Sequence, residues 1–163
     1  MELELTRSVS DRRLYELVGI GTIRMPSLFA RGPAIATAGG TPWLFERRFW
    51  GRGAIATADG GALSGEFEPR TLRRGGTVRW NERGLALRPA SSFRERYALA
   101  DDDRELALFD GKSWGKRPVK VTLEDDSLDH GLVLFAAWIV RGLAEDAGTA
   151  AAVASSTAAT GSG

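Results

Sequence analysis

Arginine is the residue type that offers this sequence the most chemistry, since it supplies 19 of the 22 basic residues. Residues 44–97 carry eleven Arg and six acidic residues, whereas residues 98–146 carry six basic and eleven acidic residues. The first segment therefore has a formal charge of +5 and the second of −5, although the whole chain is close to neutral at +1. A planar guanidinium binds phosphate or carboxylate groups through paired hydrogen bonds. This asymmetry predicts that the first segment contacts an anionic partner.

Strand periodicity is predicted to place several of these arginines on one surface. Alternate residues of a strand point to opposite faces, and the apolar residues of 78–87, with Phe93 and Tyr97, are predicted to face the core. Arginines between them then face solvent, and two arginines of the preceding loop extend the surface. The predicted anion-binding residues are Arg73, Arg74, Arg79, Arg88, Arg94 and Arg96. The alternative is that an Arg-rich composition explains the cluster and that Glu82 and Glu95 neutralise it.

Aspartates cluster at two places, and calcium prefers carboxylate oxygens as ligands. The run 101–103 is more typical of a hairpin turn. Asp125, Asp126 and Asp129 precede a long apolar segment, where carboxylates complement the positive end of a helix dipole. Neither cluster has the spacing of an EF-hand, so the predicted role is structural. A calcium site at Asp125, Asp126 and Asp129 stays open as the alternative.

The side chains that usually carry catalysis are sparse. The sequence has no cysteine, and His130 is its only histidine. A zinc site needs three or four ligands, and a Ser-His-Asp arrangement on a Gly-x-Ser-x-Gly turn has no such turn here. Gly111-Lys112-Ser113 matches only the end of a phosphate-binding loop, because Leu106 stands where its first glycine belongs. We therefore predict a structural His130, no enzymatic activity, no metal and no cofactor.

The elements that must position these residues are predicted to be strands. Apolar and polar residues alternate over short stretches from about residue 14 to residue 123, and the alternation breaks at Gly, Asp, Asn or Pro. The stretch Ala34–Ala38 recurs as Ala54–Ala58, which predicts a repeated strand and turn of a meander. With about 8–12 residues for each strand and turn, roughly 10–13 short strands are expected.

A helix is predicted at about residues 126–145. Residues 132–140 are all apolar and cover every side of a helix, so this helix must be enclosed. A membrane span is the competing interpretation, but it needs about 20 apolar residues, and only eleven separate Asp129 from Arg141. We predict a mainly β fold, a closed antiparallel barrel around a buried C-terminal helix. An antiparallel sheet with the helix packed across one face is the alternative.

Residues 1–146 are predicted to form a single domain. Residues 147–163 contain only Ala, Gly, Thr, Ser and one Val, a composition that predicts a disordered tail. The acidic start of the sequence lacks the basic and apolar segments of a secretory signal. We therefore expect a cytoplasmic location, with peripheral contact at the inner membrane surface.

The order of these features resembles the tubby C-terminal-like superfamily, which includes tubby domains, LURP-one-related proteins and phospholipid scramblases. The resemblance spans about residues 14–146 and implies a closed barrel threaded by a hydrophobic C-terminal helix. It rests on the many short hairpins, on Trp114-Gly115-Lys116-Arg117-Pro118-Val119-Lys120-Val121, on Glu124-Asp125-Asp126 and on the terminal apolar helix. The phosphoinositide-binding residues of tubby domains have no match here, and neither do the cysteines and proline-rich segment of scramblases. The Arg- and Ala-rich composition also resembles that of actinobacterial proteins.

The function predicted from these features is that of a non-enzymatic binding module. Its outward Arg face would contact anionic lipid head groups or an acidic protein, and nucleic acid is less favoured because the net charge is only +1. The alternative is a small-molecule carrier or an enzyme that uses a cavity at the barrel mouth. In that alternative the cavity contains His130 or the acidic cluster at 125–129.

Overall fold

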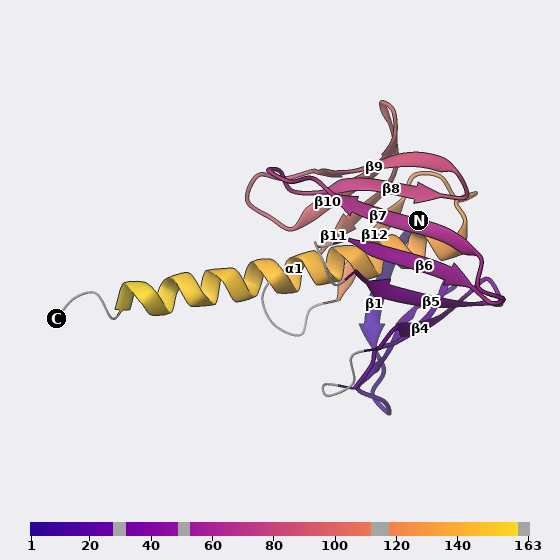
Figure 1. Cartoon of the computed structure of the whole chain (residues 1–163), viewed down its shortest axis with the longest axis horizontal. Coiled ribbons are helices and arrows are strands. Elements are labelled where there is room, and N and C mark those ends of the chain that lie inside the picture. The colour runs from indigo at the N-terminus through magenta and orange to yellow at the C-terminus, as the bar shows by residue number, and fades with distance from the viewer. Residues whose placement is uncertain (28–31, 49–52, 112–117, 160–163) are drawn as a thin grey trace.

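The computed structural model shows a closed barrel of twelve antiparallel strands with a helix inside it (Figure 1). The strands follow one another around the barrel in chain order, and the first pairs with the last to close it. This confirms the predicted fold. The structure describes residues 1–27, 32–48, 53–111 and 118–159.

The strands are short, from four to seven residues each. Their bounds are β1 Glu2–Arg7, β2 Leu14–Leu17, β3 Gly21–Arg24, β4 Ala34–Ala38, β5 Thr41–Arg47, β6 Ala54–Ala58, β7 Leu63–Pro69, β8 Gly76–Trp80, β9 Arg83–Pro89, β10 Arg96–Asp101, β11 Arg104–Asp110 and β12 Val119–Leu123. The helix, α1, spans His130–Ala159. Within the described residues, no helix has both the length and the apolar character needed to cross a membrane.

Alternation along the strands sets which side chains face the barrel interior. In β4 every second residue is buried, and β8 and β12 follow the same rhythm. The repeated stretch forms β4 and β6, as the sequence predicted. Each copy leads into a turn where Gly40 and Gly60 adopt φ of 80° and 95°, a region that glycine reaches without strain. The repeat is therefore a recurring strand and turn.

The barrel interior is filled by the first half of α1. All residues from Leu132 to Val140 are buried, as the enclosure of the helix predicted. The inward side chains of β4 and β6 are mainly alanines, and their small volume leaves room for the helix. An aromatic cluster packs between the helix and the wall: Trp43, Phe45, Trp80, Phe135 and Trp138.

The predicted start of the helix near residue 126 was wrong by one turn. The helix begins at His130, and the carboxylate of Asp129 accepts a 3.1 Å hydrogen bond from the backbone N–H of Leu132. Asp129 is therefore the N-cap, since such a bond satisfies one of the free amides of a first helical turn. Residues 125–128 form a separate turn, closed by a bond from the N–H of Leu128 to the carbonyl of Asp125.

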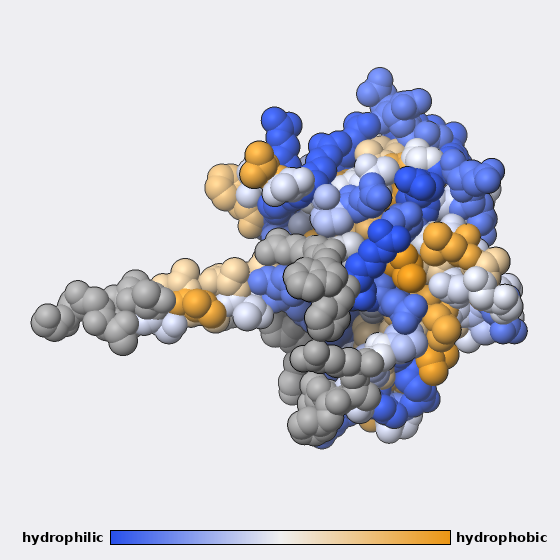
Figure 2. Space-filling view, viewed as in Figure 1, coloured by the Kyte–Doolittle hydropathy of each residue, from blue (hydrophilic) through white to orange (hydrophobic). Residues whose placement is uncertain are grey.

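The helix extends past the predicted end near residue 145, and residues 147–159 of the segment predicted as a disordered tail are helical in the structure. The helix ends at Ala159, and its C-terminal part stands clear of the barrel (Figure 2). Alanine has the highest helix propensity, and the enclosed half has already met the cost of helix nucleation. The hydroxyls of Thr149 and Ser155 donate bonds of 3.0 Å to carbonyls one turn earlier, so these polar residues fit the helix.

Two sequence features lie outside the described residues. Residues 112–117 include Trp114 to Arg117, which help to carry the resemblance to tubby-like proteins. They also include Lys112 and Ser113 of the phosphate-loop-like motif.

Candidate functional site

Two of the predicted arginines, Arg79 and Arg88, lie on the outer face of β8 and β9, as the alternation predicted. Arg79 pairs across the ladder with Glu66, and their charged groups lie 3.9 Å apart. Arg88 donates a hydrogen bond to the backbone carbonyl of Asp102. Both guanidinium groups are therefore engaged by the barrel wall. Arg73, in the preceding loop, is exposed and forms no side-chain hydrogen bond or ion pair with another described residue.

Arg74 holds the loop between β9 and β10. Its guanidinium donates hydrogen bonds to the carbonyls of Ser91 at 3.1 Å and Arg94 at 2.6 Å. It also pairs with the carboxylate of Glu95 at 3.0 Å and lies over the ring of Tyr97, 5.4 Å from its centroid. Glu95 thus neutralises Arg74, and this arginine acts in the structure of the loop.

The prediction that Phe93 faces the core was wrong. Phe93 is 99% exposed, because β10 begins only at Arg96. The hydroxyl of Ser91 accepts hydrogen bonds from the backbone N–H groups of Phe93 at 3.3 Å and Arg94 at 3.1 Å. This local bonding favours a turn over a strand. Arg94 is therefore an exposed loop residue and Arg96 is half-buried, so the six predicted arginines do not form one unpaired patch.

Ionisation of the Tyr97 hydroxyl is predicted to lower the stability of the fold at alkaline pH. Burial and a 2.6 Å hydrogen bond donated to Glu95 raise the pKa of Tyr97 to about 12. Because this pKa lies above the ordinary value of 10.0, the stability that it contributes is present below pH 10 and is lost as pH rises toward 12. We expect the free energy of unfolding to fall over that interval, and to fall less in Tyr97→Phe. Denaturant titrations of both proteins on each side of pH 10 measure this; parallel curves would contradict it.

Two of the three carboxylates that were candidates for calcium have partners within the protein. Among the described residues, Asp125, Asp126 and Asp129 are not part of any group that could hold a metal ion. Asp125 accepts hydrogen bonds from the hydroxyl and the backbone N–H of Ser127, which lower the pKa of Asp125, and it pairs with Arg104 at 2.9 Å. Asp129 caps α1. Two of the three carboxylates therefore have structural roles.

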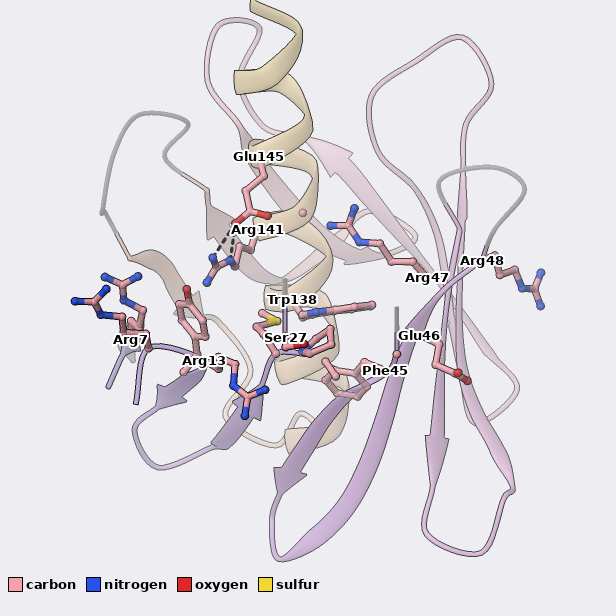
Figure 3. Close-up of a pocket in the computed structure, with 17 residues that line it drawn as sticks. Arg7, Arg13, Ser27, Phe45, Glu46, Arg47, Arg48, Trp138, Arg141 and Glu145 are labelled. Atoms are coloured by element: carbon pink, nitrogen blue, oxygen red, sulfur yellow. Dashed lines mark hydrogen bonds and ion pairs between the residues drawn. The ribbon is translucent and has the colours of Figure 1, made fainter. Parts of the chain in front are cut away.

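A cleft of about 1070 Å³ opens at the end of the barrel where α1 leaves it (Figure 3). We call it the helix-exit cleft. Tyr15 and Met25, which are half-buried, and Trp138, which is 8% exposed, form its floor, with the fully buried Phe45 behind them. Against two glutamates, six arginines line the cleft: Arg7, Arg12, Arg13, Arg47, Arg48 and Arg141.

Arg47, the last residue of β5, and Arg48, which follows it, each pair with an acidic residue. Arg47 lies 3.7 Å from the carboxylate of Asp146, and Arg48 pairs with Glu66 at 2.6 Å. Arg47 also crosses the helix at Gly142, where a Cβ would overlap its guanidinium. Each of these two arginines therefore has an acidic partner, and Glu66 is shared between Arg48 and Arg79.

Arg141 is fixed between two partners. It pairs with Glu145 through bonds of 2.9 and 2.7 Å, and its guanidinium carbon lies 3.9 Å from the centroid of the Tyr15 ring. Such cation–π stacking holds the guanidinium in one orientation. The charge of Arg141 is consequently balanced by Glu145.

The opposite side of the cleft carries arginines that form no ion pair with the described residues, although the charge of Arg13 lies near the carboxylate of Asp11. Arg7, at the end of β1, and Arg12 and Arg13, in the following turn, have no side-chain hydrogen bond or ion pair within the part of the chain that the structure describes. Arg7 is opposite Tyr15 in the β1–β2 ladder, so both side chains share one face. In Figure 3, Arg7 and Arg13 lie across Trp138 from the β5 side.

Asp11 shapes the turn that carries two of these arginines. One of its carboxylate oxygens accepts a 2.9 Å hydrogen bond from the backbone N–H of Arg13, and the other pairs with Arg24 of β3. The bond from Arg13 holds the pKa of Asp11 below its ordinary value. The carbonyl of Arg13 in turn accepts a 2.8 Å bond from the N–H of Met25, which joins the basic rim to the apolar floor.

The helix-exit cleft contains neither His130 nor the acidic residues at 125–129. His130 begins α1, about 16 Å along the helix axis from Arg141 at 1.5 Å per residue. The expectation that a cavity at the barrel mouth contains these groups is therefore wrong for this cleft.

Sequence reasoning missed the cleft because its residues come from distant parts of the chain. Arg12-Arg13 and Arg47-Arg48 are adjacent pairs, and these pairs were the available signal. Their meeting depends on the β1–β12 closure of the barrel and on the end at which α1 emerges. Comparisons of the chain with known protein families, with curated proteins and with solved structures found no match.

Proposed function

We propose that this protein is a binding module that takes an anionic molecule in the helix-exit cleft. The observation that carries the proposal is the side formed by Arg7, Arg12 and Arg13, where three guanidinium groups border a cleft of about 1070 Å³ and form no ion pair with the described residues. Asp11, the acidic group near Arg13, is itself paired with Arg24. Phosphate and carboxylate groups match the hydrogen-bonding geometry of guanidinium. The proposal is for binding without catalysis.

The shape of the site supports binding of an anion there in preference to the outer face. A concave site focuses the field of its charges and raises the local concentration of oppositely charged ligands. On the outer face, Arg79 forms a 3.9 Å ion pair with Glu66, and Arg88 donates a hydrogen bond to the carbonyl of Asp102. Arg73 and Arg94 are exposed in loops outside the cleft, so they serve as controls.

The fold also supports membership of the tubby C-terminal-like superfamily as part of this proposal. A closed antiparallel barrel around a C-terminal helix is the architecture that the resemblance implies, and the chain has it. An anionic lipid head group is then one source of the anion, which would place the protein at the inner surface of a membrane.

The test is calorimetric titration of the full chain with inorganic pyrophosphate at several salt concentrations. We expect saturable binding that weakens as salt rises, because screening reduces the attraction between exposed charges. The double variant Arg12→Gln, Arg13→Gln should bind at least about tenfold more weakly, since a hydrogen bond to a charged group contributes about 1.5–3 kcal/mol.

The matched control is Arg73→Gln, Arg94→Gln, which removes the same charge from exposed positions outside the cleft. This variant should lose less than about threefold in affinity, the long-range part of the effect. Absence of pyrophosphate binding, or an equal loss in both double variants, would overturn the proposal.

A further inference from the structure

The apolar floor of the helix-exit cleft favours a ligand that has an apolar part in addition to its charged group. Trp138 lies 5.5 Å from Phe45 between ring centroids, and Met25 and Tyr15 continue the surface toward the arginines. A simple inorganic anion would use the basic side and leave this floor in water. A ligand that covers the floor would gain the free energy of removing apolar surface from water.

The charge distribution of the cleft is asymmetric. The side with Arg7, Arg12 and Arg13 is unpaired within the described residues, whereas Arg47 and Arg48 have acidic partners on the other side. One anionic group is therefore expected at one end of the ligand, and no second one at the other. The 2.8 Å hydrogen bond from the N–H of Met25 to the carbonyl of Arg13 places the basic side directly beside the apolar floor.

Further apolar space continues beyond Trp138. A hollow of about 200 Å³ shares Trp138, Gly142, Arg47 and Arg48 with the cleft, and Phe67, Ile139, Leu143, Ala54 and Asp146 complete its lining. Gly142 has no side chain, and the guanidinium of Arg47 lies against the helix at this position. The apolar side chains of the two hollows therefore continue away from the unpaired arginines, with the paired charges of Arg47 and Asp146 beside them.

We infer that the ligand of the helix-exit cleft is an anionic amphiphile, with its phosphate or carboxylate at Arg7, Arg12 and Arg13 and its apolar body on Met25 and Trp138. This inference rests on the proposed function, because it assigns the body of the molecule whose anionic group that function requires. The head group is shared by free acyl or alkyl phosphates and by membrane lipids. The occupant is a single molecule seated in the cleft.

The test compares decyl phosphate, below its micelle concentration, with methyl phosphate, which has the same head group and almost no tail. We expect decyl phosphate to bind at least about tenfold more tightly, because several methylene groups leave water. Met25→Gln should reduce that gain, because it replaces an apolar part of the floor by a polar side chain. Met25 is half-buried at the surface, so a polar side chain of similar length suits the fold.

Each other outcome has a distinct meaning. Equal binding of decyl and methyl phosphate would overturn the amphiphile and leave the anion site standing. Decanol binding as tightly as decyl phosphate would overturn both, since the charge would then contribute nothing. Binding to vesicles of phosphatidylglycerol and phosphatidylcholine without binding of monomeric decyl phosphate would overturn the seating in the cleft and assign the arginines to a lipid surface.

Discussion

Phe135→Ala is expected to lower the free energy of unfolding by about 3–5 kcal/mol, the range found for large aromatic residues removed from protein cores. Phe135 is fully buried on α1, and its ring centroid lies 5.2 Å from that of Phe45 and 5.8 Å from that of Trp80. Removal of the ring would leave a cavity between the helix and opposite parts of the wall. Because the wall is a closed sheet, it has little freedom to collapse into that space.

The matched control for this prediction is Phe93→Ala, the same change at a side chain that is 99% exposed. It should alter the free energy of unfolding by less than about 0.5 kcal/mol. Urea titrations of the two variants and the wild type measure both values. If Phe135→Ala were as stable as Phe93→Ala, the first half of α1 would not be enclosed.

Gly131→Leu is expected to lower the free energy of unfolding by about 3 kcal/mol or more, because overpacked cores force neighbours out of place. A Cβ at this position would lie 2.8 Å from Trp43 and 2.9 Å from Trp80. Both indole rings are buried, with centroids 5.0 Å apart, so neither has space to move away. In an exposed helix, replacement of glycine would instead add stability of up to about 1 kcal/mol.

A graded series separates crowding from helix propensity at this position. Gly131→Ala should already destabilise the fold, although less than Gly131→Leu. Gly84→Ala on β9 should be close to neutral, because no neighbouring atom lies within 4 Å of the place that its new methyl group would take. Thermal unfolding of the three variants ranks them. A stabilising Gly131→Ala would show that the start of α1 is not pressed against the two tryptophans.

The sequence predicted the barrel because its two decisive patterns are local. Alternation along strands such as β8 identifies the inward residues, and the apolar run 132–140 requires enclosure. The prediction for Phe93 failed because the hydroxyl of Ser91 accepts hydrogen bonds from the backbone of Phe93 and Arg94 and so favours a turn. The alternation of apolar and polar residues does not reveal such local bonds. The helix extends past its predicted end because adding residues to an existing helix costs little, even where the residues are not hydrophobic.

The candidate site was less predictable than the fold. Arg79 and Arg88 were placed on the correct face, but their partners, Glu66 and the carbonyl of Asp102, come from other strands and turns. The unpaired arginines of the turn at 12–13 depend on where the barrel closes and on which end α1 leaves it. These are long-range features that neither spacing nor composition specifies.

The most direct measurement is an NMR titration of the full chain with decyl phosphate, following the Nε–H signals of the arginines and the indole N–H signal of Trp138. Binding in the helix-exit cleft predicts that the signals of Arg12, Arg13 and Trp138 shift together and saturate at one ligand concentration, while that of Arg94 stays in place. A shift at Arg94 with Trp138 unmoved would contradict it.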